Sequence, residues 1–231
     1  MKSTLYILLV FLLLAGCGQE DIAEKKNGYL QLGDVSVASS IVETVATRAV
    51  EEDLYIEITG GADFSVVYQP GQFPQGKLEL AEGTYLLKAY NEASQTPDAN
   101  APCYYVEQEF AIEAEKVSYV TVQVPMINVA IRLETLGEDL ENFFSNPVLS
   151  FYTTDESVKT ELHAGEVVYL DYTEGMTFTY TLSMTNTDNE TFTTEPKTYG
   201  NEEGKMVNPG HCYTISYSLE TPTLFRSEVI P

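Results

Sequence analysis

The sequence predicts an all-β protein built from two tandem β-sandwich domains. Three observations support this prediction. Apolar and polar residues alternate in many short segments, turn signals follow one another at short intervals, and two stretches of sequence recur after nearly the same distance. Many short strands with regular turns are typical of sandwiches and not of βαβ folds. The 231 residues, of which 44% are hydrophobic, are enough for two such domains at about 100 residues each.

The expected elements follow from these local patterns. Alternation with a period of two residues places every second side chain on one buried face of a strand. Such strands are expected at 54–58, 119–124 and 129–133, with an opening strand at 28–37 and a strand-turn unit at 78–89. The one helix candidate is short, at 139–144, and is expected to end before Pro147. Turns are predicted at Gly60-Gly61, Pro70-Gly71, Gln75-Gly76, Glu82-Gly83, Glu174-Gly175 and Pro209-Gly210.

An internal repeat suggests where the domains meet. The stretch 80–87 resembles 172–179 at an offset of 172 − 80 = 92 residues, and 117–122 resembles 211–216 at 211 − 117 = 94. Near-equal offsets favour a tandem pair, although turn-rich β sequences also resemble one another by chance. Pro125 would interrupt a continuing ladder, so we place the boundary near residue 126. The predicted units are a sandwich at 28–126, a second at 127–222 and a C-terminal tail at 223–231.

The N-terminus carries an export signal. An apolar run of 11 residues follows Lys2 and is too short to span about 30 Å of hydrocarbon. Leu14-Ala15-Gly16-Cys17 ends the run in the pattern that bacterial signal peptidases cut before the cysteine is acylated. We therefore expect a signal peptide at 1–16, acyl chains such as palmitate on Cys17, and a membrane tether at 17–27. An ordinary secretory signal, cut without lipidation, is the alternative.

Charge restricts the partners. The chain has 35 acidic and 12 basic residues, and loss of the signal peptide with Lys2 leaves 11 − 35 = −24. Such a surface repels nucleic acid, which is therefore excluded as a partner. Glu20 and Asp21, in the segment Gly18-Gln19-Glu20-Asp21 after Cys17, resemble the surface-export signal of lipoproteins from the Bacteroides group. This resemblance implies an outer-membrane protein displayed on the cell surface.

No catalytic motif is present, and we expect no enzyme activity and no cofactor. His163 and His211 are the available imidazoles, and neither lies in a nucleophile, zinc or phosphate-binding motif. His163 is typical of a turn residue, and His211 should point to the opposite face of its strand from Cys212. Cys103 and Cys212 fall in different predicted domains, so they are either two buried thiols or a disulfide.

The chain resembles the fimbrillin-like lipoproteins of Bacteroides and its relatives, which include anchored pilins and cell-adhesion proteins. The resemblance covers nearly the whole mature chain. It rests on the lipidation motif ending at Cys17, the opening strand, Thr47-Arg48-Ala49, the unit at 78–89 and the segment 125–130. It implies two transthyretin-like, Greek-key sandwich domains of the immunoglobulin type. It also implies that some members polymerise after an arginine-specific protease excises the first strand.

The resemblance makes Arg48 and Ala49 the candidate cleavage site. Excision of 28–48 would leave an unpaired edge that accepts another subunit's strand by β-augmentation. Arg48 as an ordinary linker residue is the alternative. The nine residues after Pro222 reach at most about 30 Å, which is short for a donor strand. We therefore expect an adhesive or fimbria-related protein that is an anchor, cap or tip component, or that acts alone.

The alternative function is glycan capture at the cell surface. The chain has 16 tyrosines and no tryptophan, and Tyr104 with Tyr105 is the candidate aromatic platform for host or bacterial glycans. A core position for one of these rings is the preferred interpretation, and the platform is a weak candidate. Asn186, Asp188 and Glu190 offer alternating oxygens that are weak candidate calcium ligands, and a solvated hairpin tip is the preferred interpretation. No other metal site is expected.

Overall fold

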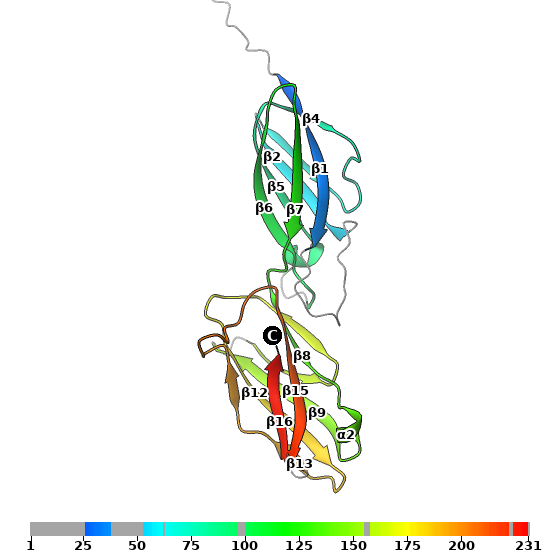
Figure 1. The fold of residues 1–231 in the computed structure, drawn as a ribbon, viewed down its shortest axis with the longest axis vertical. Helices are drawn as coiled ribbons and strands as arrows, with labels where there is room; N and C mark the ends of the chain where they lie inside the picture. Colours follow the sequence, from blue (N-terminus) through cyan, green and yellow to red (C-terminus); the bar gives the residue numbers. More distant parts are fainter. Residues whose placement is uncertain are drawn as a thin grey trace, which may run out of the picture.

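A computed structural model describes residues 26–37, 53–61, 63–96, 100–154, 158–221 and 224–230. These residues form β-strands in four sheets, with two short helical turns, so the chain is all-β as predicted. The helical turns are η2 (Glu92–Gln95) and α2 (Glu138–Glu141). Figure 1 shows two groups of strands, one containing β1 to β7 and the other β8 to β16.

The first group consists of two sheets packed face to face. One sheet has the order β3-β2-β5-β6, and the other has the order β4-β1-β7. Both sheets contribute to one core, in which Leu30, Ile58, Leu87 and Val122 have no exposed surface. The strands are β1 (Asn27–Val37), β2 (Tyr55–Gly60), β3 (Phe64–Tyr68), β4 (Leu78–Ala81), β5 (Gly83–Tyr90), β6 (Tyr105–Ile112) and β7 (Val117–Val124).

The second group repeats this arrangement around its own core. One sheet has the order β10-β9-β12-β13 with β14 also on β12, and the other has the order β11-β8-β15-β16. Phe178 and Tyr213 pack at the centre of the core with ring centroids 6.0 Å apart. The strands are β8 (Val129–Leu133), β9 (Phe144–Thr153), β10 (Lys159–His163), β11 (Val167–Leu170), β12 (Phe178–Asn186), β13 (Thr191–Thr193), β14 (Lys197–Tyr199), β15 (Cys212–Thr221) and β16 (Leu224–Ile230).

The repeat has a constant offset of 93 residues where the cores correspond. Tyr85 of β5 matches Phe178 of β12 (178 − 85 = 93), and Val120 of β7 matches Tyr213 of β15 (213 − 120 = 93). All four side chains are buried. The offsets of 92 and 94 read from the sequence were each wrong by one residue. Since side chains alternate between faces, an offset of 94 would equate buried Tyr213 with Tyr119, which is 72% exposed.

Two sequence expectations need correction. The predicted helix at 139–144 is only four residues long, and Pro147 lies inside strand β9. A bulge explains this proline, because Asn146 has a φ of 50° and the register of β9 on β12 shifts between Ser183 and Thr185. The expected C-terminal tail is also wrong over most of its length, because residues 224–230 form β16, antiparallel to β15.

A buried asparagine holds the connection between the two groups of strands. Asn128 is 3% exposed. Its Oδ1 accepts a hydrogen bond from the Cys103 N–H at 3.0 Å, and its Nδ2 donates to the Ala101 carbonyl at 2.9 Å. The Asn128 carbonyl accepts from the Gly210 N–H at 2.8 Å, so one residue contacts both sides. We propose that the groups are two domains that meet at residues 125–128, with the second extending to Ile230.

Candidate functional site

The first strand occupies the middle of a sheet. β1 pairs antiparallel with β4 over four residue pairs and parallel with β7 over seven (Figure 1). Leu30 and Val35 point into the core, with exposures of 0% and 3%. These two residues are five apart, so alternation alone would put them on opposite faces. A bulge between Leu32 and Val35 restores the register on β7 and returns Val35 to the core.

Two backbone hydrogen bonds and a close contact at Gly28 hold the start of β1. The Tyr29 N–H donates to the Lys116 carbonyl and the Glu115 N–H donates to the Asn27 carbonyl, both at 2.8 Å. Gly28 lies so close to the next loop that an added Cβ would be 2.1 Å from the Glu113 carbonyl oxygen. A side chain at this position would therefore displace β1 or the loop after β6. The position between β4 and β7 therefore fits a strand that has glycine at the place of Gly28 and apolar residues at the places of Leu30 and Val35.

The candidate cleavage and attachment residues lie outside the described residues. Cys17, Arg48 and Ala49 belong to this part of the chain. The next described residue after β1 is Asp53. Within the sequence, Arg48 comes 48 − 37 = 11 residues after the end of β1. Cleavage and lipidation therefore stay predictions.

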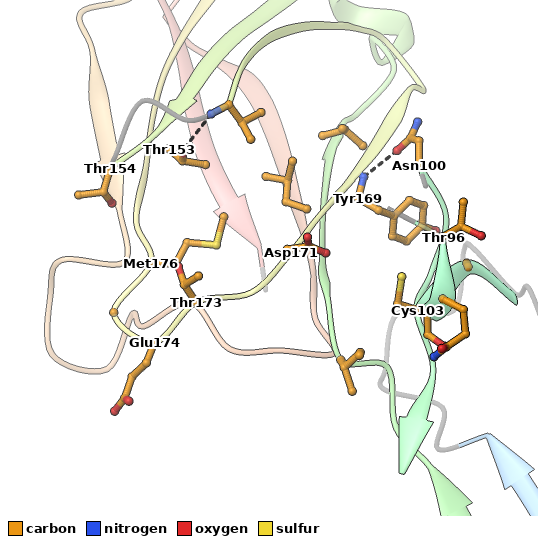
Figure 2. Close-up of a pocket in the computed structure, with 18 residues that line it drawn as sticks. Thr96, Asn100, Cys103, Thr153, Thr154, Tyr169, Asp171, Thr173, Glu174 and Met176 are labelled. Atoms are coloured by element: carbon orange, nitrogen blue, oxygen red, sulfur yellow. Dashed lines mark hydrogen bonds between the residues drawn. The ribbon is translucent and has the colours of Figure 1, made fainter. Parts of the chain in front are cut away.

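A second feature is a groove of about 1000 Å³ between the two groups of strands (Figure 2). Hydroxyl and amide side chains share its wall with apolar ones, the charged lining groups are Asp171 and Glu174, and no lysine, arginine or histidine of the described residues lines it. Its lining residues come from 93–103 and 127 on one side and from 153–176 on the other. They are Ala93, Ser94, Gln95, Thr96, Asn100, Cys103, Ile127, Thr153, Thr154, Val158, Val168, Tyr169, Leu170, Asp171, Thr173, Glu174, Gly175 and Met176.

Asn100 closes one side of the groove by bonding to the edge of β11. Its Oδ1 accepts from the Tyr169 N–H at 2.8 Å, and its Nδ2 donates to the Val167 carbonyl at 3.5 Å. Figure 2 shows Tyr169 and Asn100 side by side in the wall. Burial raises the pKa of the Tyr169 hydroxyl, so this group is a neutral hydrogen-bond donor at physiological pH. The sequence analysis missed these residues because they are 69 positions apart and follow no motif.

Tyr104 occupies the core position that the sequence analysis preferred over the aromatic platform. This ring is 7% exposed and belongs to the first core, and its N–H donates to Asn91 Oδ1 at 2.9 Å. Tyr105 is half-buried, and its hydroxyl donates to Glu107. A sugar therefore cannot stack on the Tyr104 ring without opening the core.

The candidate calcium residues form a closed hairpin tip. Asn186 Oδ1 accepts from the backbone N–H groups of Asp188 and Glu190, at 3.0 and 2.8 Å. Its Nδ2 donates to the Glu190 carboxylate at 3.1 Å. Two of the three candidate ligands are thus bonded to each other. In the described part of the chain, no group of three or more His, Cys, Asp or Glu side chains is placed to hold a metal ion.

The two thiols after Cys17 are free in the structure. Cys103 is buried, and burial followed by the nearby Asp171 carboxylate raises its pKa. Burial also raises the pKa of Cys212, and Arg132 partly offsets this effect. Both thiols are therefore weak nucleophiles. His163 ends β10 at a turn, and its N–H donates to the Glu166 carboxylate at 2.7 Å, while the His211 ring stacks on Tyr213.

The chain matches a protein-family model described as "Domain of unknown function (DUF4493)" over residues 26–227. It belongs to this family. The match spans both groups of strands, from the first described residue to within β16. Curated proteins give no match. Among the described residues, no helix has the length and apolar character needed to cross a membrane.

Solved structures of low sequence identity match this DUF4493 chain over most of its length. A fimbrilin from Porphyromonas gingivalis W83 is 11% identical, with 85% of this chain and 90% of that chain covered at a TM-score of 0.44. The fimbrial anchor protein Mfa2 from P. gingivalis is 11% identical, with 86% and 94% covered and a TM-score of 0.36. The Bacillus anthracis TIE protein is 16% identical, with 82% and 33% covered and a TM-score of 0.31.

These likenesses include the fimbrillin-like proteins that the sequence resembles. TM-scores below 0.5 at such identities carry no functional information. The function therefore has to follow from the residues of this chain.

Proposed function

We propose that this chain is a cell-surface lipoprotein with an adhesive or fimbria-related structural role, in which proteolysis allows strand β1 to be removed from the first core. The observation that supports this proposal is the position of β1. The first described strand, β1, lies between β4 and β7, and Arg48 follows it in the sequence. A single cut after Arg48 would separate β1 from the rest of the chain while leaving every other described strand intact.

Removal of β1 would create a defined acceptor. The edges of β4 and β7 would each lose their hydrogen-bonding partner, and the space filled by Leu30 and Val35 would open to water. An extended segment from another subunit would restore both. Its backbone would supply affinity, and apolar side chains at two positions would supply selectivity. A donor that takes the place of β1 would run parallel to β7 and antiparallel to β4.

The same cut would change the attachment to the membrane. The lipid predicted on Cys17 lies on the N-terminal side of Arg48, so cleavage would release both sandwiches from their own anchor. An uncut chain would stay at the outer membrane as an anchor or solitary binder. A cut chain would stay at the surface only by pairing with another subunit. Cleavage therefore selects between the anchored and the assembled role.

The proposal is tested with the chain from residue 18, digested lightly with an arginine-specific protease. Sequencing of the new N-terminus and an unboiled SDS gel give the two readouts. We expect a fragment that begins at Ala49, and SDS-resistant species where a second copy of the chain supplies the donor strand, since extensive backbone pairing dissociates slowly. Cleavage without these species would indicate that a foreign donor strand is needed. Arg48→Ala should prevent both changes, and assembly of this variant would contradict the proposed cut site.

Glycan binding in the groove is a second candidate, favoured by its hydroxyl, amide and carboxylate lining groups. Hydroxyl, amide and carboxylate groups suit the many hydroxyls of a neutral saccharide, and they disfavour sulfated or phosphorylated ligands. Thermal unfolding with neutral oligosaccharides tests this function. A rise in melting temperature that Gln95→Ala removes, and that the distant control Gln75→Ala retains, would support the groove. No rise with any neutral oligosaccharide would eliminate this candidate.

A further inference from the structure

β7 has an open hydrogen-bonding edge. Among the described residues, β1 pairs with one side of β7 and no strand pairs with the other (Figure 1). The Lys116 carbonyl points to β1, where it accepts from Tyr29, and the Pro125 carbonyl points the opposite way, to the Tyr105 N–H. Backbone groups of successive strand residues alternate in direction. The N–H groups of the odd-numbered residues 117–123 therefore face the open edge, and those of residues 118–122 with even numbers face β1.

The sequence of this edge lacks the usual protection against pairing. Proteins protect edge strands by keeping them short or by placing charges and prolines in them. The eight residues of β7, VSYVTVQV, contain no charge, proline or glycine. Each of the other edge strands among the described residues is at most five residues long or carries charged side chains. The chain has a net charge of −23, so an uncharged edge strand of this length is unusual in it. Such an edge is expected to pair with another strand.

The second group of strands shows how such an edge is covered. β15 corresponds to β7 at the offset of 93, and Thr214 corresponds to Thr121 (214 − 121 = 93). In β15, Thr214 pairs with Ile230 of the antiparallel strand β16. The first group has no equivalent of β16 among its described strands. The same type of edge is therefore covered in one half of the chain and open in the other.

We propose that β7 pairs with β7 of a second, uncut copy of this chain, antiparallel and about a two-fold axis. An antiparallel pair of identical strands is self-complementary, so one surface serves both copies. It would join the two sheets into one with the order β4-β1-β7-β7-β1-β4. On the solvent face, Tyr119 would lie opposite Thr121 or Gln123 of the other copy, depending on the position of the axis. These uncharged pairs favour cross-strand contact.

Charge matching points to β7 of a second copy, because among the described edge strands of more than five residues it is the one that brings no charge to the pair. Over most of their surface two copies repel each other, since each carries −23. The uncharged β7 edge is a place where the backbones can approach without opposing carboxylates. One eight-residue ladder is small compared with the roughly 1,000 Å² of a stable interface, so pairing should be weak in dilute solution. Anchoring in a membrane raises the local concentration to about the millimolar range and would favour the pair.

The test uses the chain from residue 18 with Arg48→Ala, so that strand exchange after cleavage cannot contribute. Sedimentation is measured from about 10 μM to about 1 mM, with residue-resolved amide exchange at both ends of this range. We expect a monomer–dimer equilibrium in which Tyr119 and Thr121 amides become at least about tenfold more protected at high concentration. The Val120 and Val122 amides should be protected at both concentrations. A concentration-independent monomer would overturn the proposal.

Two variants test the edge itself. Thr121→Pro removes one open-edge N–H without touching a hydrogen bond to β1, and it should abolish the dimer, whereas Thr121→Ser should keep it. If the proline disturbs the Val120 and Val122 amides, Thr121→Glu replaces it, because like charges would then lie close across the axis. A dimer that survives the folded variant, or oligomers in which β16 amides gain protection, would show that another surface is used.

Discussion

Leu30→Ala is expected to loosen the first strand more than any substitution on its solvent face. The Leu30 side chain is 0% exposed and belongs to a middle strand, so the cavity left behind cannot close by movement of a sheet edge. Leu→Ala changes in cores cost about 2–5 kcal/mol, and we expect about 3 kcal/mol here. This free energy corresponds to a factor of about 150 in an equilibrium constant.

Hydrogen exchange of the β7 amides that face β1 measures this effect within the first core. Because exchange there requires β1 to separate from β7, the Val120 and Val122 amides should exchange about 150-fold faster in Leu30→Ala. After cleavage at Arg48, the peptide carrying β1 should dissociate more readily by a similar factor. Tyr29→Ala is the matched control, since this ring on the same strand is 37% exposed. Equal amide exchange rates in the two variants would refute the role of β1 in closing the first core.

Three further predictions concern the second core and the connection. Asn128→Ala should lower the free energy of unfolding by about 1–3 kcal/mol in urea titrations, because it leaves the buried Cys103 N–H unpaired, while Asn208→Ala should change it little. Burial, and then the nearby Glu134 and Glu141, strongly raise the Tyr217 pKa. Since the unfolded side chain ionises first, stability should hold below about pH 10 and fall above it by up to about 1.4 kcal/mol per pH unit, a slope that Tyr217→Phe should reduce. Gly200→Ala should lower the melting temperature, because Gly200 has a φ of 100° and an added Cβ would lie 2.9 Å from the Met176 carbonyl oxygen.

Period-two alternation was a sound guide to strands but not to their correspondence. The segments around 54–58, 119–124 and 129–133 are strands in the structure, as predicted. The repeat was visible in the sequence, yet its offset was wrong by one residue in both stretches. Similar residues such as Tyr119 and Tyr213 were matched by type although one is exposed and the other buried. Residue type does not reveal the face of a strand on which a side chain lies.

Residues with strong local signals were misjudged where tertiary contacts prevailed. Pro147 normally ends a helix, but here β9 accepts it at a bulge next to Asn146. The last residues looked like a tail because they follow Pro222, yet β15 offers them a pairing edge. In each case the deciding partner lies far away in the sequence.

The sequence by itself determined the all-β class, the acidic surface, the predicted lipid attachment at Cys17 and the approximate positions of many strands. These properties depend on composition, short motifs and alternation, which are local. Only the tertiary structure decided that β1 lies between β4 and β7 and that a groove forms beside Asn100 and Tyr169. It also decided that, among the described strands, none covers the outer edge of β7 while β16 covers that of β15. Strand order and register depend on hydrogen bonds between distant segments, and local sequence does not encode which segments meet.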